Sequence, residues 1–541
     1  MLISGLLRSQ INNPINIPIK ISGTFGELRN THFHSGVDIK TEGKQGVKIF
    51  SIKDGYVKRI KISKDGFGKA IYLNHHDGTT SVYGHLKKFS SEIEKFVKEI
   101  QYKKKSYEIE IYPKNNLFVY KSGELIGYSG NTGSTSGPHL HFEVRDTKTN
   151  YPMNPLKILE NVNDTIIPKI NNLYLYDVMS DGTYHLIEKI KLKKINSNYF
   201  LTDTIKNSGI LGIGINYYDK QDISYSKNGA YSIDFKMNNE TIFEYKMDTI
   251  SLYDKRYLKL LVDFENWYLK KNKIQKLFVH PKSKYTFLNK KNYDGIIKVE
   301  NNKNYIGNIE IKDYNGNTSR IGIIIKGTPK QLMKKQTKNY NIKSDLEYTL
   351  ESKNIKVKIK KNTFFNDVYI PFEFINDTLD LGKNLYPIDK RFKIIYDLKN
   401  LDSIYQKKGF ISKINDKNKA EFIWTEKLNN IWSINTNILG KYTISIDTTP
   451  PSIKPMNFKN NQLINNQNTL KLRIKDDLSG IKKINGSING KWILLEHEPK
   501  NNTISYNLSD INFNSSKYEL EIVALDYLGN KKLYKAILYR N

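Results

Sequence analysis

Short runs in which apolar and polar residues alternate make up most of the chain. Ile, Val, Tyr and Phe supply the apolar positions, and Gly, Asn and Asp separate the runs, as at 55–63, 69–75 and 518–525. Alternation with a period of two predicts strands with one buried face, and the separating residues predict turns. We therefore expect a mainly β protein.

One stretch, residues 90–104, has the periodicity of a helix instead. Its apolar residues recur at positions i, i+3, i+4 and i+7, behind two serines that can act as N-caps. The apolar positions are Ile93, Phe96, Val97 and Ile100.

Proline-bearing segments of low hydrophobicity divide the chain at 150–168, 326–331 and 446–455. Proline cannot donate a hydrogen bond to a sheet, so such segments mark the edges of β domains. We expect an N-terminal domain over 1–160, a β-sandwich-like module over 165–330, a β-rich module of unclassified type over 331–447, and an immunoglobulin-like β-sandwich over 448–541.

A short internal similarity supports this modular organisation. Residues 309–327 and 520–540 each contain a strand, an Asp-Tyr pair, a Gly-Asn turn and a closing strand. The turns at Gly316-Asn317 and Gly529-Asn530 are typical of tight hairpins.

The net charge of +31 and the sequence pI of about 9.6 are those of a nucleic-acid binder. Almost all of the basic residues are Lys, because the chain has only nine Arg. Arg binds phosphates and bases more specifically than Lys does, so this composition argues against nucleic-acid binding. The charge is also even, +9 over residues 1–160 and +22 over the remaining 381. A chain rich in Asn and poor in Ala carries such lysines as compositional background, and we expect no nucleic-acid partner.

The absence of cysteine excludes disulfides, thiol nucleophiles and Cys-ligated metals, so a metal ion must be held by His, Asp or Glu. No apolar run approaches the roughly 18 residues of a transmembrane helix. The start, MLISGLLRSQ, has neither a basic n-region nor a small-residue cleavage site, so we expect no signal peptide in this sequence.

Histidine is concentrated at one end of the chain. Of the ten histidines, seven lie in the first 160 residues: His32, His34, His75, His76, His85, His139 and His141. His185, His280 and His497 are isolated, and we interpret them as structural.

Residues 138–144, PHLHFEV, hold two of these histidines. In a strand, His139 and His141 point to the same face, which brings two imidazoles within a few ångströms of each other. The preceding segment contains Gly130, Gly133 and Gly137, which allow tight turns. The alternative is a pair of surface histidines on a strand.

Taken one at a time, the other histidines also fit either a functional or a purely structural role. His34 and Asp38, four residues apart, can converge on a cation such as Zn²⁺, or form a local hydrogen bond at a turn. His85 follows an alternating strand, which is typical of a buried core residue whose ring nitrogens are hydrogen-bonded. His75 and His76 precede an Asp-Gly turn, and we expect both to be exposed to solvent.

Taken together, these motifs closely resemble the lysostaphin-type zinc endopeptidases, the M23 peptidase family. The series is His-x3-Asp, then Tyr-Gly-His-Leu about 50 residues later, then Gly-Pro-His-x-His, and the resemblance covers about residues 20–158. The family's usual Ser-Thr before Gly-Pro-His is Thr135-Ser136 here, which keeps both hydroxyls.

The resemblance implies a site and a substrate. It implies that His34, Asp38 and His141 bind Zn²⁺ and that His85 and His139 are catalytic without binding metal. It also implies a compact antiparallel β domain with a groove over the sheet, the peptides of peptidoglycan as substrate, and a location in the cell envelope or periplasm. It says nothing of the oligomeric state.

The chemistry of these residue types agrees with that assignment. Two His and one Asp leave a fourth tetrahedral position open, which is typical of catalytic zinc. Two unligated imidazoles can transfer protons, a contribution of about 10²–10⁴-fold in rate. The alternative function is a non-catalytic cell-wall-binding or hydrolase-activating protein on the same fold, which loss of a ligand would indicate.

Overall fold

The computed structural model describes residues 12–222, 224–288, 294–329, 341–399, 401–510 and 515–540. The expectation about a signal peptide concerns residues 1–10, which lie outside these ranges. The chain forms two compact units: the first runs to Thr337 without 62–66 and 94–109, and the second comprises those two segments and the chain from Lys338. None of the helices in the described ranges is long and apolar enough to cross a membrane.

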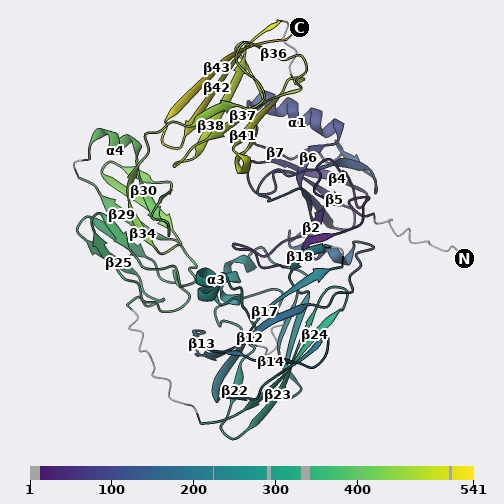
Figure 1. Ribbon diagram of the computed structural model, residues 1–541, viewed down its shortest axis with the longest axis vertical. Helices are drawn as coiled ribbons and strands as arrows, with labels where there is room; N and C mark the ends of the chain where they lie inside the picture. The colour runs from purple at the N-terminus through teal and green to yellow at the C-terminus, as the bar shows by residue number, and fades with distance from the viewer. Residues whose placement is uncertain are drawn as a thin grey trace, which may run out of the picture. The chain divides into compact units, whose positions relative to one another are not determined.

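The predicted mainly β fold is confirmed (Figure 1). Strands predicted at 55–63, 69–75 and 518–525 are β4, β5 and β42 of the structure. The N-terminal sheet has the order β1-β2-β10-β6-β5-β4-β7, with β11 beside β10, β8 beside β4, and β9 beside β3 and β6. Its strands are β1 (Ile21–Gly23), β2 (Val37–Lys40), β3 (Lys48–Phe50), β4 (Gly55–Ile62), β5 (Lys69–His75), β6 (Thr79–Phe89), β7 (Ile109–Ile111), β8 (Val119–Tyr120), β9 (Leu125–Ser129), β10 (His139–Asp146) and β11 (Pro152–Met153), and the 3₁₀ helix η1 (Pro155–Lys157) follows.

The helix predicted at 90–104 is confirmed as α1 (Ser91–Lys104). Ile93 and Val97, one turn apart, are its fully buried residues. From Glu94 onward the helix belongs to the second unit, where the Tyr102 ring packs edge-on against Trp492 with centroids 5.3 Å apart.

A module of two sheets follows in the first unit. One sheet has the order β13-β12-β17-β18, with β21 and β22 also on β17; the other has the order β14-β15-β24-β23-β19-β20, with β16 on β24. The elements are β12 (Lys169–Val178), β13 (Tyr184–Ile190), β14 (Leu192–Lys194), β15 (Tyr199–Thr202), β16 (Ile205–Lys206), β17 (Gly209–Gln221), β18 (Ser224–Asn228), β19 (Ser232–Met237), β20 (Glu240–Lys246), η2 (Asp254–Tyr257), α2 (Leu258–Leu261), α3 (Phe264–Lys270), β21 (Gln275–Lys276), β22 (Ile297–Val299), β23 (Asn304–Lys312) and β24 (Thr318–Lys326).

Two further modules, each of two sheets around a shared apolar core, lie in the second unit. The first pairs β25-β26-β29-β33-β32 with β27-β28-β34-β30-β31, and the second pairs β35-β37-β41-β40 with β36-β43-β42-β38-β39. Their elements are β25 (Tyr348–Ser352), β26 (Ile355–Ile359), β27 (Glu373–Ile375), β28 (Thr378–Asp380), β29 (Phe392–Asp397), α4 (Ser403–Lys408), β30 (Gly409–Ile414), β31 (Ala420–Phe422), β32 (Glu426–Leu428), β33 (Ile431–Thr436), β34 (Lys441–Ile446), β35 (Ser452–Pro455), β36 (Gln462–Leu463), β37 (Thr469–Lys475), β38 (Ile481–Ile488), β39 (Lys491–Trp492), β40 (Glu496–Glu498), η3 (Pro499–Asn501), β41 (Thr503–Asn507), β42 (Lys517–Asp526) and β43 (Lys531–Tyr539).

The internal similarity between 309–327 and 520–540 corresponds to two like hairpins. Strands β23 and β24 pair around Gly316, and β42 and β43 pair around Gly529; both glycines have positive φ, 91° and 78°. The predicted hairpins are therefore confirmed.

Candidate active site

Three neighbouring strands bring the sequence-predicted residues together. His141 of β10 lies opposite Asp38 of β2 on one side and opposite Gly84 of β6 on the other. This register places residues from three distant parts of the chain at one end of the sheet. His141 is 3% exposed, so the alternative of two surface histidines on this strand is wrong.

His34, Asp38 and His141 meet at a single point. Nε2 of His34 lies 3.1 Å from Oδ1 of Asp38 and 3.2 Å from Nδ1 of His141, and that Nδ1 lies 2.9 Å from the same carboxylate oxygen. Ligands bound tetrahedrally to zinc at 2.0–2.1 Å are about 3.3 Å apart. The three atoms thus form a triangle of the size that one zinc ion requires.

Hydrogen bonds on the far side of each ring set the tautomers of these imidazoles. Nδ1 of His34 donates to the carbonyl oxygen of Thr24 at 2.9 Å, which leaves a lone pair on Nε2. Nε2 of His141 donates to Oε1 of Glu143 at 2.9 Å. Such outer hydrogen bonds are usual for metal-ligating histidines, because they orient the ring and raise its basicity.

The pKa values at this point show how the acidic and basic groups stabilise one another's charges. Burial raises the pKa of Asp38, but the charge of His34 and hydrogen bonds from three imidazoles hold it well below its usual value. Burial lowers the pKa of His141, but hydrogen bonds to Asp38 and Glu143 raise it to about 9. The carboxylate of Asp38 is therefore ionised between two imidazoles, and this donor set of two His nitrogens and one carboxylate oxygen fits zinc.

The other two predicted residues flank this triangle. The His85 and His139 rings have centroids 4.7 Å apart, and Nε2 of His139 lies 3.4 Å from Oδ1 of Asp38. Nδ1 of His85 donates to the carbonyl of Thr132 at 2.8 Å, and Nδ1 of His139 donates to the carbonyl of Gly137 at 2.9 Å. Both rings therefore turn Nε2 towards the site.

Burial, together with the charges of His141 and His139, lowers the pKa of His85 to about 3. His85 is consequently neutral, with the lone pair of its ring on Nε2. Its backbone has a φ of +59°, an uncommon conformation for a residue other than glycine. Such backbone conformations cluster at functional sites.

Several supporting residues were missed by the sequence reasoning. Nη2 of Arg29 lies 2.9 Å from Oδ2 of Asp38. Nε of Arg145 donates to Oε2 of Glu143 at 2.5 Å, and Ser35 donates to the other oxygen of that carboxylate. Burial raises the pKa of Glu143, but Arg145 and His141 lower it to about 2, so Glu143 is ionised. Its position two residues after His141 on one strand was a usable signal, since such residues share a face.

Gly36 allows the segment that carries His34 and Asp38 to lie close to the backbone of β10. A Cβ atom at this position would lie 2.3 Å from the carbonyl oxygen of Phe142 on β10. Only glycine allows the two backbones to come this close.

Of the two histidines expected to be exposed before the Asp77-Gly78 turn, only one is. His76 is exposed, but His75 is 6% exposed and ends β5 facing inward. Its Nδ1 hydrogen-bonds the carbonyl of Asp54 at 2.9 Å and its Nε2 hydrogen-bonds Oγ of Ser81 at 2.7 Å. Because these two partners satisfy both ring nitrogens, the ring is stable in the interior. His32 is exposed.

Comparison with known families locates the matches in two parts of the chain. Residues 32–102 match the model of peptidase family M23, and residues 339–447 match the model of the Zu5-like domain. The resemblance to M23 peptidases predicted from the histidine motifs is thus confirmed.

The individual relatives described here align with about a quarter of the chain. The DD-carboxypeptidase/endopeptidase Mpg of Neisseria meningitidis is 29% identical over 144 residues, or 26% of this chain and 27% of that protein. An uncharacterized metalloprotease of Haemophilus influenzae is 31% identical over 136 residues, or 25% of this chain and 22% of that protein. The solved catalytic domain of lysostaphin from Staphylococcus simulans is 24% identical, with 26% of this chain and 90% of that domain aligned and a TM-score of 0.20. The aligned region thus spans about a quarter of the curated relatives' length.

Proposed function

We propose that this chain, whose N-terminal part is a domain of peptidase family M23, is a zinc-dependent endopeptidase that hydrolyses peptide cross-links of peptidoglycan. The observation that carries the proposal is the convergence of five residues: three ligand atoms within 3.2 Å of one another, with two further imidazoles directed at the same point. The name of the Neisseria relative, a carboxypeptidase and endopeptidase, supports the reaction class.

In this proposal His34, Asp38 and His141 hold zinc through Nε2, Oδ1 and Nδ1. Arg29 orients Asp38 through its second oxygen, and Glu143 orients His141 through the far ring nitrogen. When bound, zinc supplies Lewis-acid chemistry, polarising the scissile carbonyl and lowering the pKa of water towards about 7.

His85 and His139 transfer the protons. Each ring donates through Nδ1 to a backbone carbonyl, so each presents Nε2 to the reacting atoms. One imidazole of the pair accepts a proton from the attacking water, and the imidazolium that results stabilises the oxyanion of the substrate. The leaving amine then takes a proton from the same pair of rings. We place the protein in the cell envelope, where this substrate occurs.

The test is digestion of purified cross-linked peptidoglycan by the full chain, with mass spectrometry of the released fragments. We expect cleavage that stops with chelator and returns with zinc. His34→Ala should lose both zinc and activity, whereas His139→Ala should keep zinc and lose about 10²–10⁴-fold in rate. His76→Ala, at an exposed histidine of the same domain, is the matched control.

One outcome would reject the peptidase assignment. If the chain binds one zinc ion but releases no fragments, and His139→Ala behaves as the parent does in binding peptidoglycan, the protein is a non-catalytic wall-binding or hydrolase-activating protein.

A further inference from the structure

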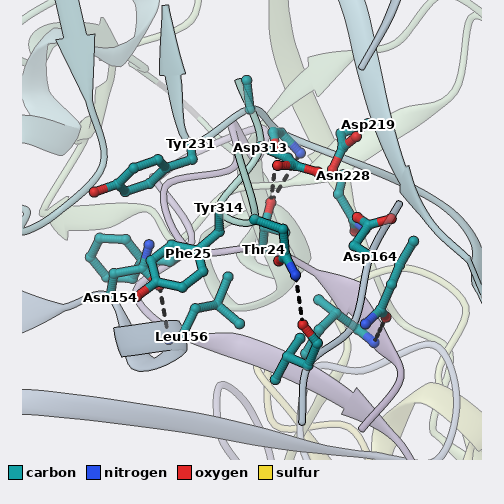
Figure 2. A pocket seen from close by; sticks show the side chains of 16 residues that line it. Thr24, Phe25, Asn154, Leu156, Asp164, Asp219, Asn228, Tyr231, Asp313 and Tyr314 are labelled. Atoms are coloured by element: carbon teal, nitrogen blue, oxygen red, sulfur yellow. Dashed lines mark hydrogen bonds between the residues drawn. The ribbon is translucent and has the colours of Figure 1, made fainter. Parts of the chain in front are cut away.

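Three carboxylates that are not part of the histidine site gather in the module that follows the N-terminal sheet. Asp164 precedes β12, Asp219 is near the end of β17, and Asp313 directly follows β23. One oxygen from each lies within 4.8 Å of the other two. Figure 2 shows these side chains and that of Asn228 gathered beside a cavity of about 30 Å³.

Two buried oxygens at this place have no protein partner. Oδ1 of Asp219 and Oδ1 of Asn228 accept no hydrogen bond from the described residues, although each side chain is only 4% exposed. The two residues face each other across β17 and β18. An unsatisfied buried oxygen is costly, and a bound water or ion removes that cost.

Within the described ranges, no basic side chain forms an ion pair with this cluster. Among the ion pairs of the described residues, none involves Asp164, Asp219 or Asp313. This is notable in a chain with 86 Lys and Arg, because three carboxylates packed together repel one another strongly. Burial, together with the charges of Asp313 and Asp164, raises the pKa of Asp219 to about 8. A bound cation would stabilise the ionised form of this carboxylate.

We propose that Asp164, Asp219 and Asp313, together with Asn228, bind one calcium ion. The donors are all oxygens, which hard cations prefer and which disfavour zinc at this place. Calcium binds oxygen at 2.3–2.6 Å, so its ligands lie up to about 5 Å apart, in accord with the spread of this cluster. Magnesium is smaller, demands octahedral geometry and keeps several waters.

The C-terminal module contains a similar cluster that serves as an internal comparison. Asp447, Asp476 and Asp526 also bring one oxygen each within 4.8 Å of the others. There, Asp447 accepts from the backbone of Thr449 and Ser479, and Asp526 accepts from Leu528 and Asn530. In the first cluster Asp164 and Asp313 also accept backbone N–H groups, but Oδ1 of Asp219 accepts none, whereas Oδ1 of Asp476 accepts from Leu478 and Gly480. We therefore assign the calcium site to the first cluster alone.

The proposed ion has a structural consequence for the histidine site. Asn228 is followed by Gly229, whose N–H donates to Oγ1 of Thr24 at 3.0 Å, and that hydroxyl donates back to the carbonyl of Gly229 at 3.2 Å. The carbonyl of the same Thr24 accepts from Nδ1 of His34. Calcium fixes Asn228 and thereby stabilises the segment that orients His34.

The test uses the full chain, stripped of metal and reloaded with one equivalent of zinc, and titrated with calcium chloride by calorimetry. We expect one calcium ion per chain and an upward shift of several degrees in the melting temperature of the first unit. Asp219→Asn should abolish both effects while the zinc content stays at one. Asp476→Asn, the equivalent change in the other cluster, is the matched control and should leave both unchanged.

A second variant keeps the proposal testable if Asp219→Asn does not fold. Asn228→Ala removes one neutral oxygen and should weaken calcium binding by about tenfold or more. The proposal is overturned if no calcium binds at millimolar concentration, if magnesium binds equally well, or if calcium binding survives Asp219→Asn or Asn228→Ala unchanged.

Discussion

Nδ1 of His141 lies 2.9 Å from Oδ1 of Asp38, although 103 positions separate the two residues. The contact follows from strand pairing, since His141 and Asp38 are direct partners in the register of β10 and β2. Backbone hydrogen bonds of the sheet therefore set the positions of two of the three proposed ligand residues, whereas His34 lies in the segment before β2. Sites of this kind position their ligands more precisely than loops do.

We expect Glu143→Gln to weaken zinc binding by about 10–100-fold, because the charged acceptor of the His141 ring is lost while the ligands themselves are unchanged. Competition with a chromophoric chelator measures the affinity. Glu124→Gln, at an exposed glutamate of the same domain, is the control and should bind zinc as the parent does. Equal affinities for parent and Glu143→Gln would mean that Glu143 does not support the ligand.

Gly36→Ala should destabilise the N-terminal domain by about 1–3 kcal/mol, since the new methyl group would overlap the carbonyl of Phe142. Separation of β2 from β10 also moves Asp38 away from His141, so zinc affinity should fall together with stability. Thermal unfolding and zinc content are the two measurements. Gly137→Ala is the comparison, because a Cβ atom there meets nothing within 4 Å. A Gly36→Ala protein with normal stability would contradict the close approach.

The stability of the first unit should increase with pH in a way that depends on Lys276. This residue is 1% exposed, and its Nζ lies 4.0 Å from the centre of the Tyr184 ring. Burial lowers the pKa of Lys276 from 10.5 to about 7. Between about pH 7 and 10 the unfolded chain therefore binds a proton that the folded chain does not, and rising pH favours the folded state.

Replacement by an uncharged residue tests this linkage. Lys276→Met should be more stable than the parent at pH 7, and the difference should shrink as the pH approaches 9. Hydrogen exchange of the β17 and β21 amides at several pH values measures local stability. A difference between parent and variant that does not change with pH would show that Lys276 keeps its charge in the folded state.

The histidine site could be largely predicted from the sequence because its residues occur in short motifs. The spacing within His-x3-Asp and His-x-His carries the information, and strand alternation supplies the common face of His139 and His141. Arg29 and Thr24 could not be predicted, since their contacts depend on how the segment before β2 folds back on the sheet. His75 was mispredicted because the turn signal after it outweighed the strand that ends at it.

The acidic clusters could not be predicted from the sequence. Asp164 lies in the linker, Asp219 in β17, and Asp313 directly after β23, which belongs to the other sheet of the module. The alternation of apolar residues predicts those strands, but not which of them become neighbours. The similarity between 309–327 and 520–540 did indicate that Asp313 and Asp526 occupy equivalent turns.

Those equivalent turns provide a last prediction, which concerns Asn317 and Asn530. Each side chain donates to the aspartate four residues before it and to a backbone carbonyl of the segment that precedes its module, Asp164 or Asp447. Replacement by Ala removes both hydrogen bonds and leaves a buried carbonyl unsatisfied, a loss of about 1–3 kcal/mol.

The expected effect of Asn530→Ala is confined to the second unit, because its partners Asp526 and Asp447 both lie there. Its melting transition should fall while zinc content and calcium binding stay at parent values. Asn317→Ala should instead destabilise the first unit and weaken calcium binding, since the same side chain positions Asp313 and the carbonyl of Asp164. Calorimetric scans of both variants, with and without calcium, separate the two results. If Asn317→Ala and Asn530→Ala had the same effect on both units, the two turns would not have independent roles.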